Sequence, residues 1–248
     1  MSPTANLWPL APAGLADLMQ AAKAVFFDFD GPLCDVFFAH PAAPIAEELK
    51  TAAKGVWGEL PGELESSPDP HAVLRELRLA SLGTDGTAEK KRAIVAELEA
   101  RLAWHEVKAA RSAKATAGAA DLVVALHKRV KKLLVTSNNA AEAVWVQLRS
   151  QRIDGLFDHV VGRNPEDPLL MKPHPYCVNR AVDLVQLPAG DCLLIGDQPT
   201  DTEAAAAAGV RFLGYAPDAP HAAALEGSGA TDVVASLGDV VKALRPLK

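Results

Sequence analysis

The sequence has few aromatic residues, few cysteines and no long apolar run. Aromatic residues make up 5% of the 248 residues, and the only cysteines are Cys34, Cys177 and Cys192. The N-terminal stretch shows neither the basic region nor the continuous apolar segment of a secretory signal, so we expect reduced thiols and a cytoplasmic protein. The longest apolar runs fall far short of the roughly 20 residues that span a bilayer, so no membrane association is expected.

Positive charge is also scarce. The chain has 25 lysines and arginines against 31 aspartates and glutamates, which gives a formal net charge of -6. A chain of this balance has no overall field that would gather nucleic acid, so we expect no nucleic-acid partner. The hydrophobic content of 49% is typical of a globular protein, and the length allows one α/β core with a smaller inserted domain.

Short apolar segments recur along the chain and predict buried strands. Helical patterns separate the later ones, including the stretches 140–152 and 202–208, and the second of these ends at Gly209, a natural helix stop. Alternating strands and helices predict a parallel sheet wrapped by helices. The five predicted strands are 24–27, 133–135, 159–161, 192–195 and 210–213.

The first two predicted strands are separated by about a hundred residues that show helical patterns only. This stretch is too long for an ordinary crossover in a compact domain. Pro44, Asp69 and Thr87 are placed to begin three helices there. We therefore predict an inserted helical domain, and we expect an extra helix within the first twenty residues. The predicted domains are a core made of 1–35 and 116–248 and a helical domain at 36–115.

Two pairs of carboxylates follow predicted strands. Asp28 and Asp30 come directly after the strand 24–27, and Asp197 and Asp201 follow the strand 192–195. Ligands bind at the carboxyl ends of parallel strands, so these acids are expected to meet at one edge of the sheet. Acids so close repel one another unless a cation compensates, and Mg²⁺ prefers oxygen ligands. The first pair alone is weak evidence of a functional site, because the same pattern occurs in calcium loops and in plain turns.

Two further parts of the sequence carry groups that could bind phosphate. Ser137 and Asn138 come after the strand 133–135, where a hydroxyl and a backbone N–H could hold a phosphoryl oxygen. Lys172 begins a Lys-Pro-His-Pro segment, and its ammonium could balance the charge of phosphate and acids. Both have common alternatives, because Ser-Asn often starts a helix or turn and a lone lysine is usually solvated.

Together and in this order, the four elements resemble the four motifs of the haloacid dehalogenase-like superfamily. They read DFDG at 28–31, TSN at 136–138, MKPHP at 171–175 and GDQPTD at 196–201. The resemblance covers roughly Val25 to Leu213. It implies a Rossmann-like, doubly wound core with a helical cap after the first motif, as in phosphoglycolate-phosphatase-like members.

The resemblance also implies a reaction and its residues. Asp28 would be the nucleophile that forms an aspartyl-phosphate, and Asp30 would protonate the leaving oxygen and then activate water. The implied function is magnesium-dependent hydrolysis of phosphate monoesters of a small phosphorylated metabolite. Asp201 would either support the metal or orient Lys172. The matched phosphate-binding residues are Ser137, Asn138 and Lys172, and the matched Mg²⁺ ligands are Asp28, the main-chain carbonyl of Asp30, Asp197 and Asp201.

One position departs from the family pattern, and three other functions stay open. Pro32 stands where phosphatases of this type usually carry threonine, so a backbone donor and a hydroxyl are missing. A 2-haloacid dehalogenase would share Asp28 but usually has tyrosine in place of Asp30. A sugar-phosphate mutase would share all four motifs, and an idle binding or regulatory domain would keep only the fold.

The predicted helical domain offers several candidates for substrate contact, and the sequence does not single out one of them. We expect Trp104 and His105 to point to different sides of their helix and neither to be essential. The same sequence leaves the substrate and the oligomeric state open. The candidates are His40, Trp57, His71, Trp104 and His105.

Overall fold

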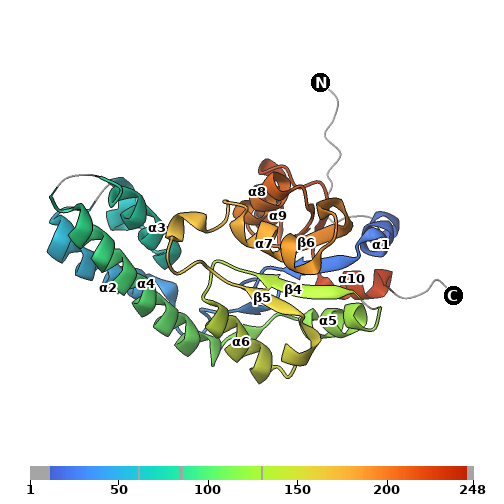
Figure 1. Cartoon of the computed structure of the whole chain (residues 1–248). Coiled ribbons are helices and arrows are strands. Elements are labelled where there is room, and N and C mark those ends of the chain that lie inside the picture. Colours follow the sequence, from blue (N-terminus) through green and yellow to red (C-terminus); the bar gives the residue numbers. More distant parts are fainter. Residues whose placement is uncertain (1–11, 61, 84–85, 130, 245–248) are drawn as a thin grey trace.

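A six-stranded parallel sheet flanked by helices forms the body of the protein (Figure 1). The computed structural model describes residues 12–60, 62–83, 86–129 and 131–244. The predicted α/β class is confirmed, and all five predicted strands are present. The last of the five begins one residue later than expected, and a sixth strand at the edge of the sheet was not predicted. In sheet order the strands are β5 (His159–Val161), β4 (Lys132–Thr136), β1 (Ala24–Phe27), β6 (Cys192–Gly196), β7 (Arg211–Tyr215) and β8 (Val233–Val234).

Different helices cover the two faces of the sheet, because alternate strand residues point to opposite sides. Val25 and Phe27 belong to the same buried cluster as residues of α1, α5, α6 and α10. Phe26 and Leu134 pack on the other face with α7 and α8. The helices around the sheet are α1 (Pro12–Ala21), α5 (Ala119–His127), α6 (Ala141–Ser150), α7 (Tyr176–Val185), α8 (Pro199–Ala208), α9 (Ala219–Gly227) and α10 (Leu237–Ala243).

The order of the strands determines where a ligand can bind. The central strand β1 pairs with β4 on one side and with β6 on the other. The chain reaches β5 at one edge and then crosses β1 to begin β6, and such a reversal opens a crevice at the carboxyl ends of the strands. Asp28, Ser137 and Asp197 directly follow β1, β4 and β6, so the sheet brings them to this edge.

Three helices project from one end of the sheet as a helical insertion, which we define as α2 (Ala42–Trp57), α3 (Pro70–Ala80) and α4 (Ala88–Ala110) (Figure 1). The insertion lies between two short antiparallel strands, β2 (Cys34–Asp35) and β3 (Lys114–Ala115). It has its own apolar cluster, which includes Leu49, Leu74 and Leu98. The side chain of Asp69 accepts a hydrogen bond from the backbone N–H of His71 at 2.9 Å, so the expected cap of α3 is present.

The extra N-terminal helix belongs to the core. Of the twenty residues expected to contain it, 1–11 lie outside the described residues, and α1 begins at Pro12. Leu15 and Met19 are buried against the sheet cluster, so α1 covers one face of the core. The three cysteines are buried and form no disulfide. No helix in the described part of the chain is long and apolar enough to cross a membrane.

The sheet core gives a direct test of this packing. Leu134 is fully buried, so Leu134→Ala is expected to lower the free energy of unfolding by about 2–5 kcal/mol, measured by urea denaturation. Leu79 is 52% exposed on α3, so the same substitution there should cost no more than about 0.5 kcal/mol. Equal losses at the two positions would contradict the burial of β4.

Candidate active site

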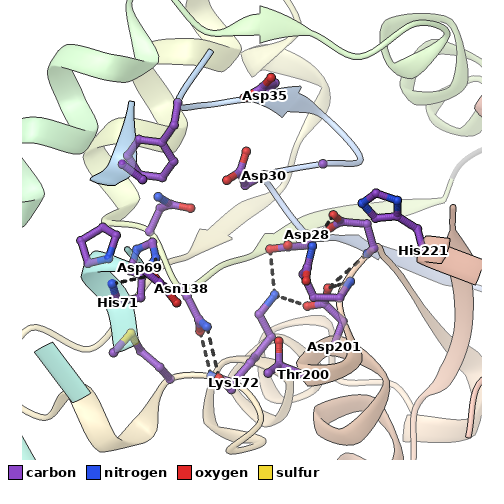
Figure 2. A pocket seen from close by; sticks show the side chains of 18 of the residues that line it. Asp28, Asp30, Asp35, Asp69, His71, Asn138, Lys172, Thr200, Asp201 and His221 are labelled. Carbon is purple, nitrogen blue, oxygen red and sulfur yellow. Dashed lines mark hydrogen bonds and ion pairs between the residues drawn. The ribbon is translucent and has the colours of Figure 1, made fainter. Parts of the chain in front are cut away.

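A cavity of about 680 Å³ lies at the carboxyl edge of the sheet, between the core and the helical insertion (Figure 2). Side chains of both parts line it. The insertion side includes His71 and Arg75, both from α3. The core side includes most residues expected from the sequence, namely Asp28, Asp30, Asn138, Lys172, Asp197 and Asp201.

Lys172 occupies the centre of the core side, where its ammonium bridges two carboxylates. Its Nζ donates to Asp28 Oδ1 at 2.7 Å and to Asp201 Oδ1 at 2.5 Å, and the side chain is only 2% exposed. Burial alone would lower the pKa of Lys172, but the carboxylates of Asp201 and Asp28 outweigh burial and raise it. Lys172 is therefore a buried cation held between two acids (Figure 2).

The carboxylates around Lys172 are crowded. One oxygen from each of Asp28, Asp197 and Asp201 lies within 4.8 Å of the others. Burial, followed by repulsion from Asp201, raises the pKa of Asp28 to about 7, although Lys172 opposes the rise. Burial and repulsion from Asp28 also raise the pKa of Asp197 well above its ordinary value. A divalent cation would reverse this penalty, because its charge favours the ionised acids.

Among the described acids of the site, Asp197 has a carboxylate oxygen that is free to bind a metal ion. Its Oδ1 is buried and has no hydrogen-bond partner among the described residues, whereas Oδ2 accepts from Gln198 Nε2 at 2.8 Å. A buried carboxylate oxygen without a partner is costly unless a cation or another donor satisfies it. The donor set of carboxylate oxygens therefore fits a hard divalent cation such as Mg²⁺.

Asp201 is occupied by other contacts. Its Oδ1 binds Lys172, and its Oδ2 accepts from the backbone N–H groups of Asp197 at 3.2 Å and Gln198 at 3.1 Å. The second set of contacts caps the N-terminus of α8. Of the two roles expected for Asp201, these contacts favour the orientation of Lys172.

Close packing between the first and fourth motifs explains Gly31. The residue has φ +99°, and a Cβ there would lie 2.3 Å from Cγ of Asp197, so only glycine fits. The turn that follows is held by hydrogen bonds from Gly31 N to Cys34 O at 2.7 Å and from Cys34 N to Phe29 O at 3.2 Å. Neither bond uses an N–H of residue 32, so the turn accommodates Pro32.

Asp30 lies beside Asp28 on the cavity wall but in a different environment. Its Oδ1 accepts a hydrogen bond from Val36 N at 2.8 Å, and its carboxylate is not part of the group of three acids. Burial raises the pKa of Asp30 to about 6, while the Val36 N–H opposes the rise. A carboxyl group with such a pKa can both donate and accept a proton near neutral pH.

The loop after β4, residues 137–140, departs from expectation at Ser137. The Ser137 hydroxyl is buried and bonds with Asn139, accepting from its N–H at 3.0 Å, and Ser137 is not among the residues that line the cavity. Asn138 and Asn139 line it instead. Asn138 also exchanges two hydrogen bonds with the main chain of Lys172, at 2.7 and 3.2 Å. The loop and Lys172 are thereby fixed to each other.

Of the five candidates from the predicted helical domain, only His71 lines the cavity. Its Nε2 lies 2.7 Å from Glu106 Oε1. Trp104 is 59% exposed and His105 bonds with Glu48 and His40, away from the lining. Arg75 also lines the cavity and was not predicted, because a charged residue on a helix is most often a solvated one.

A buried charge cluster made of Glu99, Glu106 and Arg163 was not predicted either. The two glutamates lie seven residues apart on the face of α4 that buries Leu98 and Leu102. Two acids on an apolar face require a buried cation, so this spacing could have revealed the cluster. Arg163, which follows β5, supplies that cation: its guanidinium contacts Glu99 at 2.9 Å and Glu106 at 2.7 Å.

Comparisons with known proteins agree with this fold. Residues 22–209 match the family model described as haloacid dehalogenase-like hydrolase. A haloacid dehalogenase-like family hydrolase from Streptococcus pneumoniae superposes with a TM-score of 0.59 at 18% identity, covering 91% of this chain and 100% of that one. A structure titled as a predicted phosphoglycolate phosphatase from Haemophilus somnus 129PT superposes with a TM-score of 0.56 at 20% identity, covering 91% and 99%. At such identities the likeness shows the fold.

One curated relative matches part of the sequence. It is named "Putative pyrophosphatase PpaX", from Caldanaerobacter subterraneus subsp. tengcongensis, and is 31% identical over 93 residues. The match covers 38% of this chain and 41% of that protein. The chain thus matches less than half the length of this relative.

The buried cluster generates a prediction for acid stability. Burial alone would raise the pKa of Glu106, but Arg163 and His71 outweigh it and lower the pKa to about 2. A lowered pKa in the folded state adds stability above the unfolded value near 4.5, and this stability is lost as pH falls towards 2. The linked free energy is on the order of 3 kcal/mol.

Glu106→Gln should therefore lower the free energy of unfolding at pH 7, and its difference from the wild type should shrink between pH 4.5 and 2.5, measured by urea denaturation across pH. Glu97→Gln, at an exposed ion pair with Arg101, is the control and should change little at any pH. A difference at Glu106 that stays constant down to pH 2.5 would contradict the charged state of Glu106.

Proposed function

The chain belongs to the haloacid dehalogenase-like hydrolase family, and we propose that it is a magnesium-dependent phosphatase acting on phosphate monoesters of a small phosphorylated metabolite. The observation that carries this proposal is the buried ammonium of Lys172 between Asp28 and Asp201, with Asp30 on the same wall. We further propose that residues 36–115 act as a cap domain, since α3 forms one wall of the cavity.

The proposed metal site uses residues that fit Mg²⁺. Asp28 and Asp197 would provide carboxylate oxygens, and Asp30 would provide its main-chain carbonyl. The unpartnered Oδ1 of Asp197 supports this assignment. When bound, Mg²⁺ would offset the negative charge of the acids and of the phosphoryl oxygens.

Two aspartates divide the chemical steps. A carboxylate oxygen of Asp28 attacks phosphorus, the bond from phosphorus to the leaving oxygen breaks, and Asp30 gives that oxygen a proton. Asp30 then removes a proton from water as the water oxygen attacks phosphorus, and the bond from phosphorus to Asp28 breaks. The products are an alcohol and phosphate, and both aspartates return to their starting states.

The remaining groups position the phosphate. Lys172 supplies a buried positive charge that stays protonated beside Asp28, which suits the charge that develops on the phosphoryl oxygens. Asn138 and Asn139 line the same cavity, whereas Ser137 fixes the shape of their loop. We therefore assign phosphate contact to the part of this loop that lines the cavity and a supporting role to the Ser137 hydroxyl.

Asp30 also separates this proposal from dehalogenation. A halide leaves without taking a proton, so a haloacid dehalogenase has no use for an acid at this position. Here the carboxyl group of Asp30 lines the cavity, and its pKa near 6 suits proton transfer to an ester oxygen. Asp30 thus favours phosphate esters as substrates.

The first test is phosphate release from a panel of small phosphate esters. Asp28→Asn should lower turnover by about a thousandfold or more, because it removes the nucleophile, and Asp30→Asn by about 10²- to 10⁴-fold. Asp35→Asn is the matched control, since this exposed carboxylate also lines the cavity and has no assigned step. Release that survives in Asp28→Asn would refute the mechanism, and transfer of phosphate to a sugar without net release would indicate a mutase.

Metal binding can be tested without turnover. Saturating Mg²⁺, at about 100 times its dissociation constant, should raise the melting temperature of the wild type by about 5–10 °C. Asp197→Asn should abolish this response, yet the metal-free variant should melt no lower than the wild type, because one repelling acid is gone. An unchanged Mg²⁺ response in Asp197→Asn would exclude Asp197 as a ligand.

A further inference from the structure

A charge cluster lies entirely inside the junction between the helical insertion and the core. Glu106 on α4 and the side chain of Arg163 after β5 are fully buried, and Glu99 is nearly so. Each charge in such a place must be paired, because an unpaired buried charge is strongly destabilising. The three groups hold two negative charges and one positive charge, so a further donor is favoured, and His71 Nε2 contacts Glu106 at 2.7 Å.

The cluster is connected to the loop 137–140 at several points. Glu106 Oε2 accepts from the backbone N–H of Ala140 at 2.8 Å, and Oε1 lies 3.4 Å from Asn139 Nδ2. Arg163 donates to the carbonyl of Asn138 at 2.6 Å, and its backbone N–H donates to the carbonyl of Asn139 at 2.9 Å. Glu106 and Arg163 therefore fix both ends of the segment that faces the cavity.

Gly162 shows how tightly this junction is packed. A Cβ at residue 162 would lie 2.5 Å from the backbone nitrogen of Ala141 and 2.8 Å from the carbonyl oxygen of Asn139. Both neighbours are main-chain atoms, which cannot move aside without moving the loop. The chain therefore brings Arg163 against the loop only because residue 162 has no side chain.

Glu106 is also connected to the insertion side of the cavity. Glu106 contacts His71, one of the α3 residues on the insertion side of the cavity. Through Arg163 and Asn138 it is also connected to the main chain of Lys172. Glu106 itself is not among the residues that line the cavity. Any influence on the reaction must therefore pass through its neighbours.

We propose that Glu106 is a positioning residue, which holds the loop 137–140 and His71 in place around the bound phosphate from within the helical insertion. This inference rests on the proposed phosphatase function. Glu99 provides a matched comparison, because its Oε1 accepts two hydrogen bonds from the same Arg163, at 2.9 and 3.0 Å. Among the described residues, Glu99 makes no hydrogen bond or ion pair with the loop or with His71. A merely structural cluster would make the two glutamates equivalent.

The experiment compares Glu106→Gln with Glu99→Gln in the full chain. We would measure kcat and KM on the best ester of the panel, the affinity for inorganic phosphate in the presence of Mg²⁺ by calorimetry, and the melting temperature. Both variants should melt lower than the wild type. Glu106→Gln should lower kcat by about 10- to 100-fold, since a misplacement near 1 Å can cost that much. It should also weaken phosphate binding by about tenfold, whereas Glu99→Gln should stay within about threefold in both.

A second variant covers the case in which Glu106→Gln does not fold. Glu106→Asp keeps the charge beside Arg163 but withdraws the carboxylate by one methylene from Ala140. It should fold and still show the loss in kcat and in phosphate affinity. Full activity in a folded Glu106→Asp would overturn the proposal.

The outcomes separate this inference from the proposed function. If the wild type hydrolyses esters through Asp28 and the two glutamine variants lose activity equally, the phosphatase function stands and the positioning role of Glu106 fails. If no ester is hydrolysed but phosphate affinity falls in Glu106→Gln alone, the positioning role stands and hydrolysis fails. Absence of phosphate binding in the wild type would refute both.

Discussion

The buried ammonium of Lys172 is the interaction on which the site depends. Two carboxylates that follow separate parallel strands, Asp28 after β1 and Asp201 in the first turn of α8, both bind it within 2.7 Å. Without that charge the two buried acids would repel each other. The main chain of Lys172 is in turn fixed by two hydrogen bonds with the side chain of Asn138. The proposed phosphate site therefore surrounds a cation that hydrogen bonds hold in place.

A second buried cation has a different task. Arg163 lies between the core and the helical insertion, and its partners Glu99 and Glu106 come from α4. Lys172 neutralises acids on the cavity wall, whereas Arg163 joins two parts of the chain and supports the loop that carries Asn138. Both cations tie sequence-distant segments together, and in each case removal of the cation would leave two buried acids without their counter-charge.

The sheet and the helical insertion together explain why the cavity is lined by side chains that lie far apart in the sequence. The parallel sheet aligns the ends of β1, β4 and β6, while the insertion brings His71 and Arg75 over the same edge. Because Gly31 has no side chain, the first motif can pack directly against the carboxylate of Asp197. A rigid arrangement of this kind suits phosphoryl transfer, in which positioning and charge compensation contribute most.

The sequence by itself determined the α/β fold class, and it singled out Asp28, Asp30, Lys172, Asp197 and Asp201, which the structure brings to one cavity. Strand periodicity and short motifs are local features, so neighbouring residues were enough to predict the strands 24–27 and 159–161 and the cap of α3 by Asp69. The same holds for the positions of Asp28 after its strand and of Lys172 at the start of its stiff segment. Only the tertiary structure decided that Ser137 turns under its loop, that His71 alone of the five candidates reaches the cavity, and that Glu106 meets Arg163. These contacts join residues far apart in the chain, and no local pattern specifies the angle at which one helix crosses another.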